Sequence, residues 1–188
     1  RRALLKYRYE QLYVNQRLDT LVLEEQIQDF YDQHPERFVL QRPVVKARFM
    51  SIPAQSPVLK MIRKKMSSDD MEDVMEADSM AYSAAYRFNI WDDEWIDAMT
   101  LAKEFGAESS SVLASVKKGW IERTDTAGVM SVAYVSEIVP AGKMSPREYC
   151  EPFIKDMIIS VRKQELVSTL ERDLLRDARE SGKFEILK

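Results

Sequence analysis

The chain has 188 residues, of which 45% are hydrophobic and 31% are charged, a composition typical of globular proteins and unlike that of disordered chains. The formal net charge is -3 and the basic residues form no stripe, which argues against nucleic acid as a partner. The longest apolar runs, such as residues 157–159, are far too short to span a bilayer, so we expect no transmembrane segment.

The first residue and the single cysteine bear on the compartment of the protein. Because the sequence begins with Arg1 rather than methionine, we expect a mature form from which a signal sequence or a lipoprotein anchor was removed upstream. Cys150 is the only cysteine, which excludes an internal disulfide, and one cysteine by itself cannot form a zinc site.

Apolar residues at helical spacing predict two helices at the start of the chain, over residues 3–18 and 23–33. Pro35 follows the second of these helices and is a typical stop signal. Residues 43–53 predict a strand, because this β-branched and apolar run is bracketed by two prolines, which are excluded from the interior of a sheet.

The middle of the chain, residues 57–105, has a helical pattern throughout. Asp92 or Asp93 is expected to cap a helix in this segment that carries Trp95 and ends at Gly106, since glycine commonly ends helices.

A β-hairpin is expected next. A short helix around residues 112–116 precedes it, and the hairpin itself covers residues 119–139 with its turn at 124–128. Four residues of its second strand are expected to share one face: Met130, Val132, Tyr134 and Ile138.

The clearest signal in the sequence is a long helix over residues 145–182. Ser145 is a capping residue, Pro146 suits the first helical position, and Glu148 completes a capping box. Apolar residues then recur at helical spacing and need a surface to bury against, among them Ile158, Val161, Leu170 and Leu174. Beyond this helix, residues 184–187 predict a short closing strand.

Few residues could carry covalent chemistry. His34 is the only histidine, and without a multi-histidine set or a local catalytic signature we interpret it as a solvated residue at a helix end. No glycine motif for phosphate binding occurs. The carboxylates of residues 69–78 lack the spacing of a calcium loop, which favours a solvated acidic helix face. The sequence therefore predicts no catalytic residue, no metal site and no cofactor.

Methionine is concentrated in one short stretch, at Met61, Met66, Met71, Met75 and Met80. The methionine side chain is flexible and polarizable, so exposed methionines would form a tolerant surface for binding other polypeptides. The blander interpretation, which helical spacing favours, is that these residues pack the inside of a helical layer. The candidate contacts with polypeptide clients are Met71, Met75, Trp91 and Trp95, and the same two interpretations apply to the tryptophans.

The order of elements at the two ends of the chain resembles that of a known family. Residues 23–31, in which acidic residues precede an aromatic pair, and then Phe38 resemble the helix before the isomerase domain of SurA-type periplasmic folding factors. This family includes the parvulin-type prolyl isomerases. Residues 43–52 resemble the first strand of a parvulin domain, residues 128–138 its last strand, and residues 140–186 the helix that returns to the start of the chain.

The resemblance implies an α+β fold in which residues 1–42 and 140–188 form a helical chaperone module around an inserted, degenerate parvulin-like lobe at residues 43–139. Active parvulins carry a histidine in the first strand where this chain has Phe49, and another in the last strand where it has Met130. The family's glycine-rich loop is missing as well. Apolar side chains cannot supply hydrogen bonds around a twisted amide, so we expect no isomerase catalysis.

The function that the resemblance implies is ATP-independent binding and escort of unfolded polypeptides in the periplasm, among them proteins bound for the outer membrane. Two other functions are left open: an active prolyl isomerase with a rearranged pocket, and a structural adaptor that binds one folded partner. The sequence also leaves a homodimer open.

Overall fold

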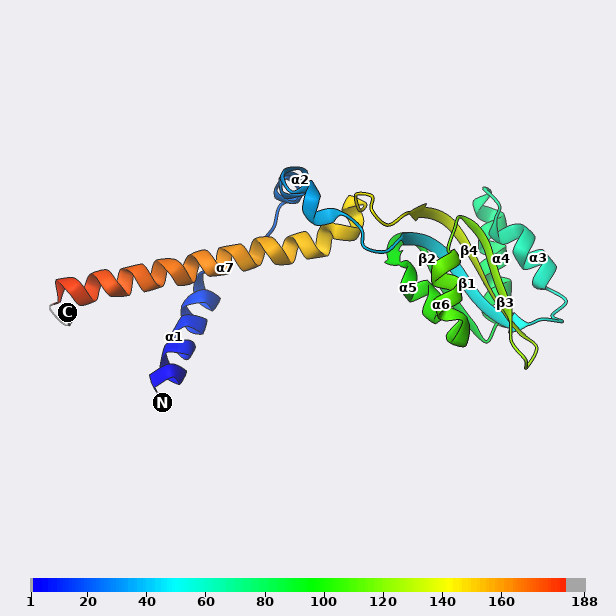
Figure 1. Cartoon of the computed structure of the whole chain (residues 1–188), viewed down its shortest axis with the longest axis horizontal. Helices are drawn as coiled ribbons and strands as arrows, with labels where there is room; N and C mark the ends of the chain where they lie inside the picture. Colours follow the sequence, from blue (N-terminus) through cyan, green and yellow to red (C-terminus); the bar gives the residue numbers. More distant parts are fainter. Residues whose placement is uncertain (1, 182–188) are drawn as a thin grey trace. The chain divides into compact units, whose positions relative to one another are not determined.

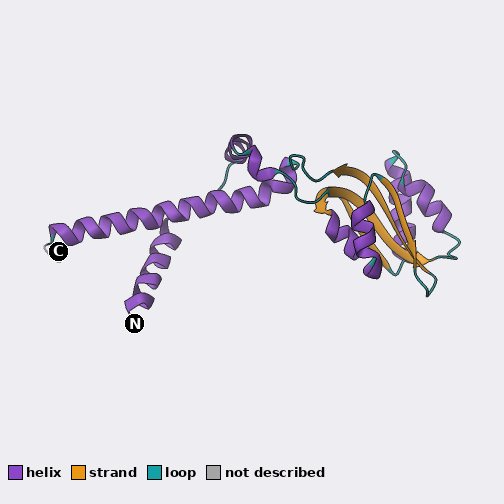
Figure 2. Cartoon of the chain, viewed as in Figure 1, coloured by secondary structure: helices purple, strands orange, loops and turns teal. Residues whose placement is uncertain are grey.

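The structure is a computed structural model that describes residues 2–181 (Figure 1). The described part contains seven α-helices and one four-stranded antiparallel sheet, which confirms the α+β class (Figure 2). The chain divides into two compact units. We call the unit of Pro35–Cys150 the central unit, and the unit built from the chain ends, up to His34 and from Glu151 onward, the terminal unit. From the sequence, we expected the boundaries of the helical module and the inserted lobe between residues 42 and 43 and between residues 139 and 140.

The terminal unit is helical. It contains α1 (Arg2–Arg17), α2 (Glu24–Gln33) and most of α7 (Arg147–Glu180), whose first residues belong to the central unit. These helices lie where the apolar periodicity predicts them, with ends that differ by one or two residues. The closing strand expected at residues 184–187 lies outside the described residues.

A small set of apolar side chains forms the interior of the terminal unit, with one or more from each helix: Val14, Ile27, Ile154 and Leu170. Arg162 of α7 holds the segment between α1 and α2 by donating to the carbonyl oxygens of Asp19 and Leu21 at 2.9 and 2.6 Å. The same guanidinium donates to Gln26 Oε1 at 2.9 Å. Lys6 of α1 pairs with Glu171 of α7 at 3.2 Å.

The central unit is built on the sheet. Its strands are β1 (Val44–Pro53), β2 (Arg87–Asp97), β3 (Gly119–Thr124) and β4 (Val129–Val139), in the spatial order β2-β1-β4-β3. Its helices are α3 (Leu59–Met66), α4 (Met71–Ala84), α5 (Ala98–Lys103) and α6 (Ser109–Ser115), with 3-10 turns at Pro35–Phe38 and Gly106–Glu108. The strand between two prolines and the hairpin at residues 119–139 are confirmed.

Helices cover both faces of the sheet, α3 and α4 on one and α5 and α6 on the other (Figure 2). Alternate residues of β1 supply the two cores, since side chains of a strand point to opposite faces in turn. Phe49 packs on the α5–α6 face, where its ring lies edge-on to that of Phe105 with 5.3 Å between the ring centres. Met50 and Ile52 pack on the α3–α4 face, against Ile62 among others.

Residues 87–97 were expected to be helical, and the structure shows that this was wrong: they form β2. Asp97, and not Asp92 or Asp93, caps the following helix by accepting from the backbone N–H of Met99 at 2.8 Å. Register with β1 is lost between the pairs Val45 with Ile96 and Ala47 with Trp91. This irregularity breaks the period of two by which a strand is recognised.

Two smaller expectations about faces are corrected as well. The register of β4 shifts near Ser136, so Ile138 joins the α5–α6 core instead of sharing a face with Val132. Along α7, Leu170 is buried, but Val161 and Leu174 are 50% and 47% exposed. The apolar face of the long helix is therefore only partly covered.

Candidate functional site

A cavity of about 290 Å³ lies within the central unit on the α3–α4 face of the sheet. Met66, Met71 and Val74 line it from the helices. Arg48 of β1 and Tyr134 of β4 line it from the sheet. The rest of the lining is polar or charged and includes Ser67, Ser68, Asp69, Asp92, Lys118 and Ser136, so the cavity is more polar than a typical small-molecule site.

The floor of this cavity is fixed by a buried ion pair network. Arg48 is 8% exposed, and its guanidinium pairs with Asp78 of α4 and Asp92 of β2. Burial raises the pKa of Asp78, an effect that the charge of Arg48 opposes and that of Asp92 reinforces. The guanidinium of Arg48 thus pairs with two carboxylates and links both α4 and β2 to β1.

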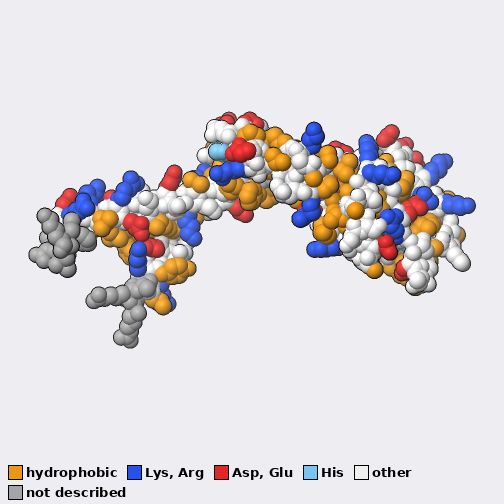
Figure 3. All heavy atoms as spheres, viewed as in Figure 1, with side chains coloured by type: hydrophobic (Ala, Val, Ile, Leu, Met, Phe, Trp, Pro, Cys, Tyr) orange, Lys and Arg blue, Asp and Glu red, His pale blue; other side chains and the backbone are white. Residues whose placement is uncertain are grey.

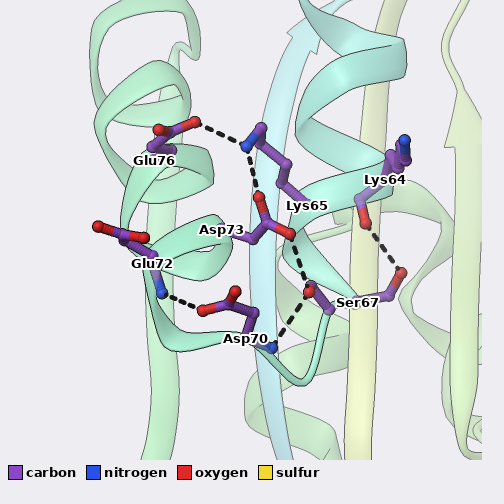
Figure 4. A network of polar contacts seen from close by, with 8 residues as sticks. Lys64, Lys65, Ser67, Asp70, Glu72, Asp73 and Glu76 are labelled. Atoms are coloured by element: carbon purple, nitrogen blue, oxygen red, sulfur yellow. Dashed lines mark hydrogen bonds and ion pairs between the residues drawn. The ribbon is translucent and has the colours of Figure 1, made fainter.

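A second polar network fixes α3 against α4 (Figure 4). Lys65 of α3 reaches Asp73 at 2.5 Å and Glu76 at 2.7 Å, and Ser68 Oγ donates to Asp73 at 3.1 Å. The hydrogen bond with Asp73 raises the pKa of Lys65 and lowers the pKa of Asp73. Asp70 caps α4 by accepting from the backbone N–H of Glu72 at 2.9 Å. The acidic run is therefore a structural part of this helix pair as well as a solvated face.

The methionines divide between the two interpretations. Met66 is buried and Met80 packs against the α3–α4 core, as residues of a helical layer do. Met61, Met71 and Met75 are 53%, 72% and 63% exposed. The ion pairs of Lys65 with carboxylates of α4 fix the two helices that carry the exposed methionines. Met71 also lines the cavity.

The two candidate tryptophans lie elsewhere. Trp91 is partly buried against the α5–α6 core, on the sheet face opposite to that covered by α4. Trp95 is also partly buried, and Lys46 Nζ lies 5.1 Å from the centre of its ring. The structure thus does not bring the tryptophans together with Met71 and Met75.

The positions at which the resembled family carries histidine face different sides of the sheet. Phe49 is fully buried on the α5–α6 face, whereas Met130 packs on the α3–α4 face. The register explains this, because Phe49 lies opposite Ala133 while Met130 lies opposite Ile52. These two positions therefore do not share a pocket.

His34 belongs to the terminal unit and Cys150 to the central unit. His34 lies at the end of α2, with its ring centre 4.8 Å from that of Phe30. Cys150 is buried, and burial raises the pKa of its thiol, which disfavours the reactive thiolate. Among residues 2–181, no group of three or more histidine, cysteine or acidic side chains is placed to hold a metal ion. None of the described helices is both long and apolar enough to cross a membrane.

A second candidate site is the surface of the terminal unit, where large apolar side chains remain exposed (Figure 3). We define the terminal apolar surface by the residues Leu4, Leu5, Tyr9, Leu12, Leu21, Phe153, Val161, Leu174 and Leu175. Leu5 and Leu21 are 67% and 66% exposed, and Phe153 is 56% exposed. The sequence predicts Val161 and Leu174 as part of an apolar helix face, but helical spacing does not reveal which part of such a face stays uncovered.

Comparison with known proteins finds similarity among solved structures alone. No family model and no curated protein matches the chain. Among solved structures, the chain is similar to a structure from a study of PEB4 and Cj1289, two SurA-like chaperones of Campylobacter jejuni. The two chains are 15% identical with a TM-score of 0.37, and the alignment covers 99% of this chain and 70% of the other.

Proposed function

We propose that this protein binds unfolded polypeptides without ATP and without isomerase catalysis, in the bacterial cell envelope. Its clients would include proteins bound for the outer membrane, as the sequence resemblance to SurA-type folding factors implies. The single observation that carries the proposal is the terminal apolar surface, because leucine, tyrosine and phenylalanine side chains remain in water on the helices that the chain ends bring together.

Full burial of a leucine or phenylalanine side chain is worth about 1.5–3 kcal/mol relative to full exposure. Leu5, Leu12 and Leu21 are 60–67% exposed, so each has more than half of that gain still to realise by contact with another chain. Contiguous exposed apolar patches mark sites of interaction with other proteins, and Leu5 and Leu12 stand two helical turns apart on α1. A surface of leucines and aromatics has no strict sequence preference, which suits unfolded clients.

The exposed methionines of the central unit support the same function. Met71 and Met75 are both more than half exposed and stand one helical turn apart on α4. Flexible thioether side chains adapt to irregular apolar partners. We therefore include this methionine surface, defined by Met61, Met71 and Met75, as a second contact for clients.

The direct test is suppression of aggregation. Several unrelated denatured proteins are diluted into buffer without nucleotide, and light scattering is followed with increasing amounts of the full chain. We expect suppression at roughly stoichiometric amounts. If several clients aggregate unchanged, general binding is wrong and a structural adaptor for one folded partner takes its place.

A paired substitution assigns the activity to the terminal apolar surface. Leu5→Ser with Leu12→Ser removes two apolar side chains that are 67% and 60% exposed on α1, so the melting temperature should change little while protection falls. The matched control is methionine at both positions, which keeps size and apolarity and should keep protection. Full protection by the serine variant would show that clients do not use this surface.

A further inference from the structure

The outer edge of β2 is a feature of the central unit that neither the cavity nor the terminal apolar surface explains. β2 lies at one end of the sheet, and β1 is its only neighbour among the strands that the structure describes (Figure 2). Residues 87–91 of β2 pair regularly with residues 47–51 of β1. An edge strand presents unpaired N–H and C=O groups outward and is a template for pairing with another extended chain.

The two edges of the sheet are not alike. β3, at the other end, has 6 residues against 11 in β2, and Lys117 and Lys118 precede it directly. A short strand and nearby lysines are the usual protection of a sheet edge. The regular part of β2 instead exposes Ile90 at 45%, with Tyr86 just before the strand at 67%. The irregular register and the carboxylates of residues 92–94 protect the second half of β2 in the same way, so residues 87–91 are the part of the edge that remains open to pairing.

A groove of about 650 Å³ lies beside this edge, between β2 and α4. Asp78 and Tyr82 line it from α4, and Phe88 and Ile90 line it from β2. Ile90 lies opposite Arg48, which pairs with Asp78, so Ile90 is on the sheet face that α4 covers. A strand added outside β2 would direct every second side chain toward this groove, because side chains alternate between the two faces.

Carboxylates collect at one end of the same edge. Asp92, Asp93 and Glu94 follow the regular stretch of β2, and Asp78 lines the groove. Arg48 pairs with Asp78 and Asp92, whereas the structure gives Asp93 and Glu94 no ionic partner over the residues that it describes. Arg48 offsets Asp78 and Asp92, and Lys118 lines the same cavity as Asp92, so the exposed carboxylates of Asp93 and Glu94 are the charges that favour a cationic group on a bound chain.

We propose that the β2 edge groove, meaning the outer edge of residues 87–91 with the groove lined by Tyr82 and Ile90, binds an extended polypeptide segment as an added strand. The occupant is a segment of an unfolded partner chain with apolar side chains at alternate positions and lysine or arginine at one end. This proposal takes its class of ligand from the proposed function and adds a third surface with a different recognition chemistry. Main-chain hydrogen bonds hold the segment, the groove selects apolar side chains, and the carboxylates select the basic end.

The test uses the full chain and a short fluorescent peptide in which valine alternates with threonine and lysines stand at one end. Binding is measured by fluorescence anisotropy. Two control peptides carry N-methyl groups on one or the other alternate set of backbone amides. Because only one set faces β2 in an added strand, one methylated peptide should bind and the other should not. Equal loss with both, or with neither, overturns strand addition.

Substitutions then place the peptide. Ile90→Lys puts a cation and a longer side chain into the groove, so we expect binding of the lysine peptide to weaken roughly tenfold. The matched control is Met144→Lys, since Met144 is 40% exposed and Ile90 is 45% exposed in the same unit. Replacing the lysines of the peptide by glutamates should weaken binding about fivefold, as expected for an exposed ion pair. Unchanged binding by the Ile90 variant, with its fold intact by circular dichroism, places the peptide elsewhere and overturns the proposal.

The outcomes separate this inference from the proposed function. If the peptide binds at β2 but the chain protects no client from aggregation, the groove stands and general client binding fails. If clients are protected while the peptide does not bind, the groove fails and the terminal apolar surface stands. Self-association of the chain that Ile90→Lys abolishes, without peptide binding, would assign the edge to a second copy of this chain and overturn the proposed occupant.

Discussion

Leu170 and Leu174 stand one helical turn apart on α7, and truncating each to alanine should lower stability by different amounts. Leu170 is 4% exposed, next to the ion pair between Glu171 and Lys6 of α1. Leu170→Ala removes a buried isobutyl group and leaves a cavity, which costs about 2–5 kcal/mol. Leu174 is 47% exposed, so Leu174→Ala loses only part of the transfer term, leaves no closed cavity and should cost about 1 kcal/mol or less.

Urea unfolding of the two variants and the wild type, followed by circular dichroism at helix wavelengths, gives the change in the free energy of unfolding for each substitution. For a unit of this size, 1 kcal/mol corresponds to a shift of roughly 4–8 °C in melting temperature. Client protection is measured in parallel: Leu174→Ala should weaken it because Leu174 belongs to the terminal apolar surface. Equal destabilisation by the two substitutions would refute this prediction, because it would mean that both side chains are buried or that neither is.

Three further predictions follow from single observations. Replacing Met71 and Met75 together by glutamate should reduce client protection with little change in melting temperature, since both are exposed; a large loss of stability would show instead that they are core residues. A protease-coupled proline peptide assay should give the uncatalysed rate, and catalysis lost on substitution within the central unit would contradict this. Asp97→Asn should lower stability at pH 7 by about 1 kcal/mol or less, because asparagine keeps the helix cap but loses the ion pair with Arg42. The hydrogen bond from Arg42 holds the pKa of Asp97 below its usual range, so this stabilisation is present at neutral pH and is lost as pH falls through that lowered pKa. Thermal melts of variant and wild type across pH measure this loss. A difference between the two proteins that persists in acid would contradict the prediction.

Local signals determined most of the elements of this protein. The capping residues at Ser145 and Pro146 predict the start of the long helix, which the structure begins at Arg147. The prolines around residues 44–53 predict β1, and the turn before Gly128 predicts the hairpin of β3 and β4. Each of these signals acts within a few residues of chain, so a single sequence contains it in full.

The tertiary structure decided what local patterns leave ambiguous. Trp91, Trp95 and Met99 recur at spacings that a helix shares, and only pairing with β1, interrupted by an irregular register, makes residues 87–97 a strand. The position of β2 at the edge of the sheet, and hence its open groove with α4, likewise depends on strands distant in sequence.

Burial was the other property that only the tertiary structure could decide. Leu170 and Leu174 fit the same apolar stripe, yet only Leu170 is covered. Met66 and Met71 fit the same methionine-rich stretch, yet Met66 lies in the core and Met71 in water. Periodicity shows that a side chain is on an apolar face, but whether that face is buried depends on which element packs against it, and this is set by residues far away in the chain.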